Sequence, residues 1–251
     1  MKVCCIGSGS DGNSWYCESA KGTGFFLDAG CPPRAILDLG LEIANKPFFV
    51  THEHGDHAKY AAELHEKYGA TIVATPGTLK ALRMLPRERE TKDASALANG
   101  NPDCLAGLKI QAVPVIHNAA EPCGWLISAD GETVLYIMDA GQIPKLPRAT
   151  VQVLICEANY TPEQMAKNAE NSKSGLYVSG RVSSGVGHLS SRQAAEIAVH
   201  YLMGLDLLLF GHLSKNNFDL IEYFKDKEIP KPVREKVILA TPGGFWDTLP
   251  F

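Results

Sequence analysis

The stretch Thr51-His52-Glu53-His54-Gly55-Asp56-His57 gathers three histidines and one aspartate between an apolar, strand-like run and a helical pattern. Histidine and carboxylate side chains are the ligands that zinc, manganese, iron and nickel take in proteins. One such loop can serve two ions, with His52 and His54 turned toward one and Asp56 and His57 toward the other. Gly55 is expected to let the backbone turn tightly enough for these side chains to converge. The alternative is a solvated polar turn that is rich in histidine by chance.

The composition of the whole chain is that of an ordinary globular protein. The chain has 251 residues, 45% hydrophobic and 21% charged, which is typical of a soluble globular protein with a sizeable core. A formal charge of -4 and a pI near 6.1 exclude the strongly basic surface that by itself marks a nucleic-acid binder, but a local basic groove stays compatible. Seven cysteines without C-x-x-C spacing indicate reduced thiols. The first residues read as a strand and not as a signal peptide, and no apolar run reaches the roughly twenty residues that cross a bilayer. We therefore expect a cytoplasmic protein with no membrane segment.

The order of strand and helix patterns predicts the fold class. Strands cluster first and then alternate with helices, and this happens twice along the chain, which favours two packed sheets with helices outside. Ser190 and Gln193 have capping-box spacing, so a helix is expected to begin there. The polar segments 86–103 and 168–187 are expected to be loops. Strands are expected at 2–6, 14–19, 24–27, 47–50, 71–74, 108–116, 124–128, 133–138, 151–156, 207–210 and 237–240.

Three further polar residues close apolar runs. His117 follows 112–116, Asp139 follows 136–138, and His212 follows 208–211. Each one alone is more typical of an ordinary polar residue at a strand end than of a ligand. Together with the 51–57 stretch they place polar side chains at the same end of successive strands. Asp28, which ends the run 24–27, either accepts a hydrogen bond from a ligand histidine or caps the next helix, and we prefer the first interpretation.

This set of residues resembles the signature of the metallo-β-lactamase superfamily, H-x-H-x-D-H followed by a later His, a later Asp and a final His. The resemblance implies an α/β protein with the αβ/βα four-layer sandwich, two mixed β-sheets with helices on the outer faces, as a single domain over 1–251. It implies two divalent metal ions, zinc or manganese with iron as a further option. The implied ligands are His52, His54 and His117 on one ion, Asp56, His57 and His212 on the other, and Asp139 between them.

A second resemblance concerns catalysis. Phosphodiesterases of this superfamily, such as the tRNA 3′-processing endonucleases, carry a Glu that ends a late strand and a His that opens a later helix, a pair thought to protonate the leaving oxygen. Glu157 and His188 match these positions. A histidine at a helix start, oriented by a carboxylate, is a sensible general acid. The alternative is that His188 helps to cap the helix and Glu157 is a surface acid. We predict Asp56, Glu157 and His188 as the catalytic residues.

Over nearly its whole length the chain is similar to the bacterial YycJ family, also called WalJ. Matching segments are Gly7-Ser8 with Gly12-Asn13, 27–30, 51–57, 117–122, 187–190 and 212–217. The resemblance implies a 5′ to 3′ DNA exonuclease linked to DNA repair. Met138-Asp139-Ala140-Gly141 replaces the usual Thr-Asp-Thr-Gly of that family, and Tyr160 stands where a histidine is common. Neither change removes a ligand, but both affect residues that are expected near the substrate.

Substrate contacts are expected close to the site, because the segment from Asp139 to His212 is too short for a β-CASP insertion and the segment from Glu157 to His188 is too short for a long tRNA-gripping arm. A tight hairpin lining the site is preferred over a phosphate-binding P-loop for the glycine-rich turn 7–13. Candidate contacts are Ser8, Asn13, Lys173, Arg181, Lys215 and Asn217. His65 and His200 fall on helical patterns and are expected to have no role in the site.

Two rival functions remain at this point. A small-molecule metallohydrolase of the same fold would act on a thioester, lactone, lactam or cyclic nucleotide; the mildly acidic pI favours it, whereas Glu157 and His188 argue against it. A non-catalytic metal-binding sensor is disfavoured by the complete ligand set. DNA is the expected partner, and the oligomeric state, the metal and the direction of digestion are not determined by the sequence.

Overall fold

The structure is a computed structural model that describes residues 1–85, 97–171 and 185–248. The first half of the chain, together with β13 from near its other end, forms a mixed seven-stranded sheet in the order β13-β1-β2-β3-β4-β5-β6. The pairs β3–β4 and β4–β5 are parallel and the other pairs are antiparallel. The strands are β1 (Lys2–Gly7), β2 (Ser14–Glu18), β3 (Gly24–Leu27), β4 (Pro47–Phe49), β5 (Thr71–Ala74), β6 (Leu97–Asn99) and β13 (Phe245–Asp247).

The second sheet has six strands in the order β12-β11-β10-β9-β8-β7. Strands β9 to β12 run parallel to one another, and β7 and β8 complete the sheet with antiparallel pairs. The strands are β7 (Leu108–Pro114), β8 (Cys123–Ala129), β9 (Glu132–Ile137), β10 (Val153–Glu157), β11 (Leu207–Gly211) and β12 (Val237–Leu239). Because β7, β9, β10 and β11 point the same way, their carboxyl ends share one edge of the sheet.

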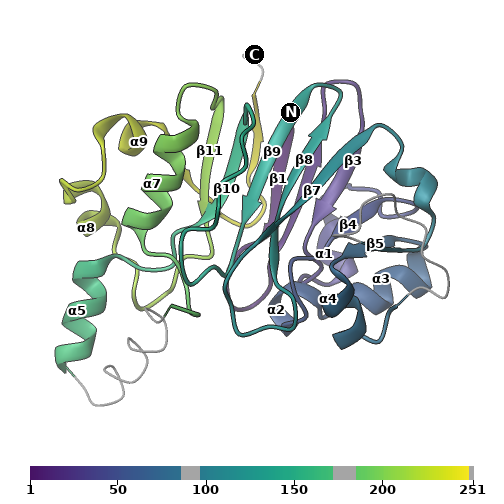
Figure 1. Ribbon diagram of the computed structural model, residues 1–251, viewed down its shortest axis with the longest axis horizontal. Helices are drawn as coiled ribbons and strands as arrows, with labels where there is room; N and C mark the ends of the chain where they lie inside the picture. The colour runs from purple at the N-terminus through teal and green to yellow at the C-terminus, as the bar shows by residue number, and fades with distance from the viewer. Residues whose placement is uncertain (86–96, 172–184, 249–251) are drawn as a thin grey trace.

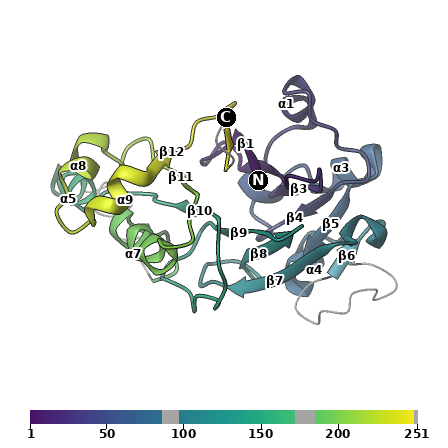
Figure 2. The same ribbon diagram turned by 90° about the horizontal axis from the view of Figure 1, so that it is seen from above.

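Helices cover the outer face of each sheet, which gives four layers (Figures 1 and 2). The first sheet is covered by α1 (Pro33–Asp38), α3 (Ala61–Tyr68) and α4 (Pro76–Ala81). The second is covered by α7 (Ser191–Tyr201), α8 (Leu220–Lys225) and α9 (Lys231–Lys236). The short α2 (Gly55–Ala58) lies at the foot of the sheets in Figure 1, and α5 (Pro162–Asn171) and the 3-10 turn η1 (Pro102–Leu105) complete the described elements. The expected arrangement of two mixed sheets with outer helices is confirmed.

Strand periodicity explains the layers. In β10, Val153 and Ile155 face the core between the sheets, whereas Leu154 and Cys156 face the core beneath the helices. All four side chains are completely buried, so the strand is apolar on both faces and reads as a continuous hydrophobic run. Burying one such aliphatic side chain contributes about 1.5–3 kcal/mol, and many of them hold the two sheets together.

The described structure contains elements that the sequence pattern does not predict. The helix α5 lies within and ahead of the segment expected to be a loop, and only Met165 of its side chains is buried. Strand β13 pairs with β1, which lies at the other end of the chain, and β6 and α9 were also missed. The helical pattern expected after the 51–57 stretch is found as α3, and the separate short helix α2 begins inside that stretch at Gly55. These elements are short or polar, and partners that are distant in sequence stabilise them. Local hydrophobic periodicity therefore does not predict them.

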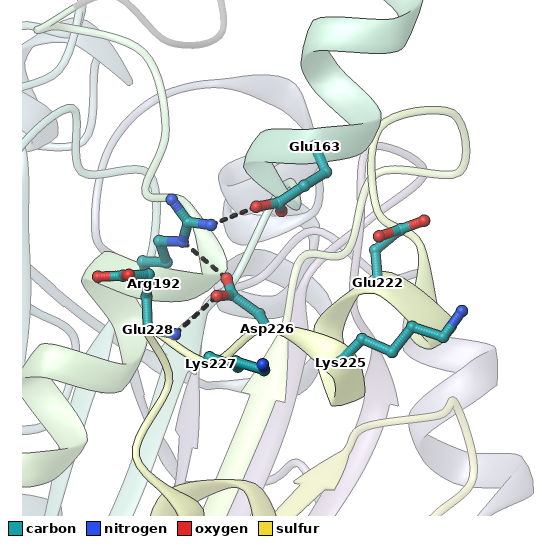
Figure 3. Close-up of a pocket in the computed structure, with 7 residues that line it drawn as sticks. All are labelled: Glu163, Arg192, Glu222, Lys225, Asp226, Lys227 and Glu228. Carbon is teal, nitrogen blue, oxygen red and sulfur yellow. Dashed lines mark hydrogen bonds and ion pairs between the residues drawn. The ribbon is translucent and has the colours of Figure 1, made fainter.

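The start of α7 is as predicted. The hydroxyl of Ser190 accepts a hydrogen bond from the backbone N–H of Gln193, and the side chain of Gln193 accepts one from the backbone N–H of Ser190. Farther along the first turn, Arg192 forms ion pairs with Glu163 of α5 and with Asp226, which follows α8. These residues line a cavity of about 290 Å³ where the three helices meet (Figure 3). The first turn of α7 is therefore fixed on both sides.

The backbone of the 51–57 loop packs closely against a neighbouring segment, and this packing depends on Gly30 and not on Gly55. Gly55 lies in α2 with an ordinary φ, and a Cβ atom there would meet nothing within 4 Å, so its expected role is wrong. A Cβ atom on Gly30 would lie 1.8 Å from the carbonyl oxygen of Asp56 and 2.7 Å from the backbone nitrogen of Asn13. The backbones of three segments therefore meet at Gly30.

We expect Gly30→Ala to lower the free energy of unfolding by about 3 kcal/mol, because the backbone contacts around Gly30 must separate to admit a methyl group. Gly55→Ala is the matched control in the same region, with an expected change within about 0.5 kcal/mol. Urea unfolding of the two variants measures both values. Equal stability of the two variants would show that the close approach at Gly30 is not required.

Candidate metal centre

The predicted metal ligands, together with Glu157 and His188, lie close to one another. The loop after β4 carries His52, and strands β7, β9 and β11 of the other sheet are followed by His117, Asp139 and His212. The carboxyl ends of these strands face the same region, so residues far apart in the chain come together. The three groups of neighbouring ligand atoms described below each lie within 4.8 Å.

Three residues at strand ends hold a backbone conformation that is unusual for residues other than glycine. Asp28, Asp139 and His212 have φ values of 59°, 49° and 50° and follow β3, β9 and β11. This left-handed conformation costs roughly 1–2 kcal/mol for most residues and less for aspartate. It turns each side chain sharply from the strand direction at the edge of the sheet.

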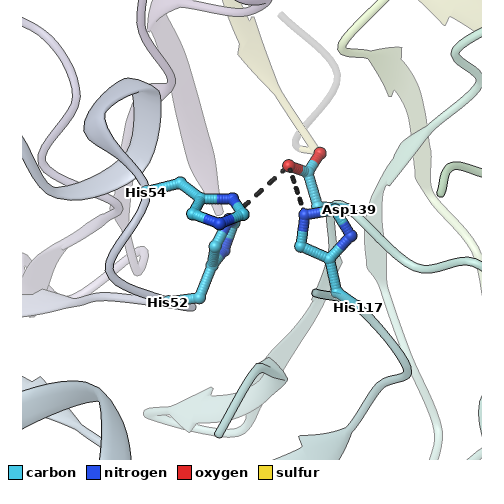
Figure 4. A group of neighbouring side chains, drawn as sticks. All are labelled: His52, His54, His117 and Asp139. Atoms are coloured by element: carbon cyan, nitrogen blue, oxygen red, sulfur yellow. Dashed lines mark ion pairs between the residues drawn. The ribbon is translucent and has the colours of Figure 1, made fainter. Parts of the chain in front are cut away.

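The first group consists of His52, His54, His117 and Asp139 (Figure 4). The Asp139 Oδ2 atom lies 3.6 Å from His52 Nε2 and 3.5 Å from His117 Nε2. His117 donates from Nδ1 to the backbone carbonyls of Val186 at 3.0 Å and Gly187 at 3.2 Å. Its Nε2 lone pair is therefore available to a cation.

The second group consists of Asp56, His57, Asp139 and His212. The Nε2 atom of His57 lies 3.3 Å from Asp139 Oδ2 and 3.4 Å from Asp56 Oδ2. The Nε2 atom of His212 lies 3.4 Å from both Asp56 Oδ2 and Asp139 Oδ1. Asp139 thus contacts both groups through its two carboxylate oxygens.

The third group joins Glu157 and His188 to Asp139 and His212. Glu157 is completely buried, and its Oε1 atom accepts hydrogen bonds from the backbone N–H groups of Ala140 and Leu189 at 2.6 and 3.2 Å. His188 donates from Nδ1 to Glu157 Oε2 at 3.0 Å, and the same nitrogen lies 3.4 Å from Asp139 Oδ1. Glu157 is therefore not a surface acid.

Electrostatics in this cluster are dominated by burial and by close opposite charges. Burial alone would lower the pKa of His188, but Glu157 and Asp139 outweigh it and raise the pKa to about 10. Burial alone would raise the pKa of Asp139, but His212 and His57 hold it well below its usual range. Burial, assisted by the charge on His57, lowers the pKa of His52. Asp139 is thus a carboxylate and His52 a neutral imidazole at neutral pH.

The donor set fits divalent metal ions. Within the described residues, His52 Nε2 and Asp139 Oδ1 are buried and have no hydrogen-bond partner. Leaving such atoms unpaired costs about 1–3 kcal/mol each, and coordination of a cation would satisfy them. Neutral imidazole nitrogens and carboxylates are the ligands that zinc and manganese accept.

Two residues that help to hold these side chains in place, Tyr136 and Asn159, were not singled out from the sequence, whereas Asp28 was. Asp28 does not cap α1; its Oδ2 atom accepts hydrogen bonds from His57 Nδ1 and from the hydroxyl of Tyr136, both at 2.7 Å. Asn159 donates to the carbonyl oxygen of His212 at 3.0 Å and lies 2.9 Å from its Nδ1. The available signal for Asn159 was its position two residues after Glu157, whereas Tyr136 occupies an ordinary core position in the pattern.

The residues predicted to contact the substrate differ in burial and in hydrogen-bond partners. The hydroxyl of Ser8 accepts a hydrogen bond from the backbone N–H of His212 at 2.8 Å. Asn13 is completely buried, and its amide nitrogen lies 3.1 Å from His57 Nε2 in the second ligand group. This placement favours a role in holding His57 over a contact with the substrate. Lys215 is exposed and pairs with Asp11 at 2.6 Å, and the Asn217 side chain accepts from Asn168 at 2.9 Å.

Lys173 and Arg181 lie outside the described residues. His65 and His200 belong to none of the three groups of ligand atoms found in the described ranges. No helix within those ranges is both long enough and apolar enough to span a membrane.

A family model described as "Beta-lactamase superfamily domain" matches residues 48–212. The chain is 28% identical over 231 residues to exodeoxyribonuclease WalJ of Streptococcus pneumoniae, covering 86% of this chain and 83% of that protein. It is 25% identical over 201 residues to exodeoxyribonuclease YycJ of Bacillus anthracis, covering 76% and 73%.

Among solved structures, the metallo-beta-lactamase fold protein YhfI from Bacillus subtilis resembles this chain with a TM-score of 0.59. The sequence identity is 15%, and the match covers 98% of this chain and 99% of that chain. At this identity the likeness shows the fold alone, and it confirms the αβ/βα sandwich.

Proposed function

The chain belongs to the β-lactamase superfamily domain family, and within that family we propose that it is a phosphodiesterase that removes nucleotides from DNA 5′ ends. The chain is a metal-dependent hydrolase of the metallo-β-lactamase superfamily. The two exodeoxyribonucleases support DNA as the substrate, since they match this chain over most of its length. A cytoplasmic role in DNA repair and a single domain without a β-CASP insertion are part of the proposal.

The proposed metal ligands are the seven residues predicted from the sequence. His52, His54 and His117 would hold one ion, Asp56, His57 and His212 the other, and Asp139 would contact both. Zinc or manganese bound there would lower the pKa of a water molecule and stabilise the charge on the phosphodiester oxygens. The buried and unpaired His52 Nε2 and Asp139 Oδ1 atoms support this assignment.

The observation that carries the nuclease proposal is the contact between His188 and Glu157. Glu157 raises the pKa of His188 and fixes its Nδ1–H, so the imidazole is protonated at neutral pH beside the ligand groups. A protonated histidine in this position supplies the proton that a departing sugar oxygen requires. Glu157 acts as a positioning residue, because its other oxygen binds the backbone at Ala140 and Leu189.

We expect stepwise release of nucleotides from the 5′ end of duplex DNA by protein reconstituted with manganese or zinc. Duplexes labelled at one end and carrying either 5′-phosphate or 3′-phosphate termini measure the direction, and protein treated with a chelator is the control. Loss from the 3′ end would contradict the direction. Intact DNA and RNA in the presence of fully metal-loaded protein would contradict the nuclease proposal.

A small-molecule metallohydrolase is the second candidate. The formal charge is -4, and Lys215, a candidate phosphate contact, is already paired with Asp11. Cleavage of a generic thioester or of bis-p-nitrophenyl phosphate, with DNA left intact, would favour this candidate over the nuclease.

A further inference from the structure

The hydroxyl group of Thr51 lies between a buried carboxylate and the ring of the next residue. Its Oγ1 atom is 2.8 Å from Asp28 Oδ1 and 3.0 Å from His52 Nδ1. All three residues are at most 1% exposed, so the hydroxyl cannot exchange these partners for bulk water. Thr51 thereby connects Asp28 with His52, although the two side chains belong to different strand ends.

Donor and acceptor capacities determine where the protons lie. The Asp28 carboxylate only accepts, and it receives the Thr51 backbone N–H at 2.8 Å, the Thr51 hydroxyl, His57 Nδ1–H and the Tyr136 hydroxyl. The Thr51 hydroxyl has one proton, and the carboxylate is its strongest acceptor. The Thr51 oxygen also lies 3.3 Å from His57 Nδ1, but the proton on that nitrogen goes to Asp28 Oδ2 at 2.7 Å. The Thr51 oxygen then accepts from the nearer His52 Nδ1 at 3.0 Å, so His52 Nδ1 carries the proton and its Nε2 carries the lone pair.

This lone pair points to the first ligand group. His52 Nε2 is buried, has no hydrogen-bond partner among the described residues, and lies 3.6 Å from Asp139 Oδ2. His57 is held in the same tautomer by its direct bond to Asp28, and its Nε2 faces the second group. One carboxylate therefore orients one histidine in each group.

We propose that Thr51 is a positioning residue. Its hydroxyl donates to Asp28 and accepts from His52 Nδ1, and this fixes the tautomer of His52 that binds metal through Nε2. Asp28 acts on His57 directly and on His52 through Thr51, so that both ligand groups are preset by one buried carboxylate. The inference rests on the proposed metal site. The Thr51 hydroxyl is then required to hold the His52 ring, and does not only fill a buried position after a strand.

The first test uses the metal-free wild-type protein, in which long-range ¹H–¹⁵N correlation spectra of the histidine rings report the tautomer. We expect His52 to carry its proton on Nδ1. A proton on Nε2 would overturn the inference, and this result requires no variant and no activity.

The second test compares Thr51→Val, which removes the hydroxyl and keeps the shape, with Thr51→Ser, which keeps the hydroxyl. Zinc titration by calorimetry should show one of two binding events weakened about 10- to 100-fold in the valine variant, as is usual when a group that orients a ligand is lost. The serine variant should bind like the wild type. Unchanged binding by the valine variant, or an equal loss in the serine variant, would overturn the inference.

The outcomes separate this inference from the proposed function. Wild-type protein that binds two zinc ions but leaves DNA intact would remove the nuclease proposal and leave the role of Thr51 standing. Wild-type protein that binds no metal would overturn both the metal site and the role of Thr51. If the valine variant fails to fold, the wild-type spectrum and the serine variant still decide.

Discussion

Asp139→Asn is expected to abolish hydrolysis almost completely, with a decrease in kcat on the order of 10³-fold or more. Asp139 belongs to all three groups of ligand atoms, and its two oxygens approach His52, His57 and His212 within 3.6 Å. Asparagine keeps the size and tolerates the φ of 49°, so the change removes charge without backbone strain. We expect the bound metal to fall below the wild-type stoichiometry, as measured by elemental analysis after dialysis.

Asp206→Asn is the matched control for this variant. Asp206 is exposed and directly precedes β11, at the opposite end of that strand from His212. It should retain wild-type metal content and activity. If the Asp139 variant kept its metal and most of its activity, the proposed ligand role of this carboxylate would be wrong.

His188→Ala is expected to lower kcat by about 10²- to 10⁴-fold, the range of a general acid. Glu157→Gln should have a comparable effect for a different reason. The amide keeps an oxygen for the backbone N–H groups of Ala140 and Leu189 but places an N–H against His188 Nδ1. The imidazole then loses the acceptor that raises its pKa, so the alkaline limb of the pH–rate profile, where the general acid loses its proton, should move to lower pH.

The double variant of Glu157 and His188 should be no slower than the single His188→Ala variant, because both residues act through the same proton. His200→Ala, on the exposed side of α7, is the control and should leave kcat unchanged. Independent, multiplicative losses in the double variant would contradict a shared role. A normal metal content in the single variants would show that the loss does not come from the ligand groups.

Local signals were sufficient for some elements. Strand β3 is found at the predicted residues 24–27, and the capping box at Ser190 and Gln193 starts α7 as expected. These signals are complete within a few residues: alternation over one strand, or a side chain that bonds to a backbone group three positions away. Strand β13 was missed because its partner β1 lies at the other end of the chain.

For the site, the sequence by itself determined the chemical types and their positions at strand ends. Histidine and aspartate within 51–57 indicated a metal loop, and His117, Asp139 and His212 stood at the ends of predicted strands, with Glu157 and His188 added by resemblance. The structure brings these residues together, and their roles as ligands and as a general acid stay predictions.

Only the tertiary structure decided which groups hold the site residues in place. Tyr136 bonds to Asp28 across 108 positions, the Ser8 hydroxyl meets the backbone of His212 across 204, and Gly30 admits the carbonyl of Asp56 where a side chain would not fit. A residue pattern records whether a side chain is polar and how it repeats along one element. It does not record which distant donor meets which acceptor, because that depends on the packing of two sheets whose strands are far apart in the chain.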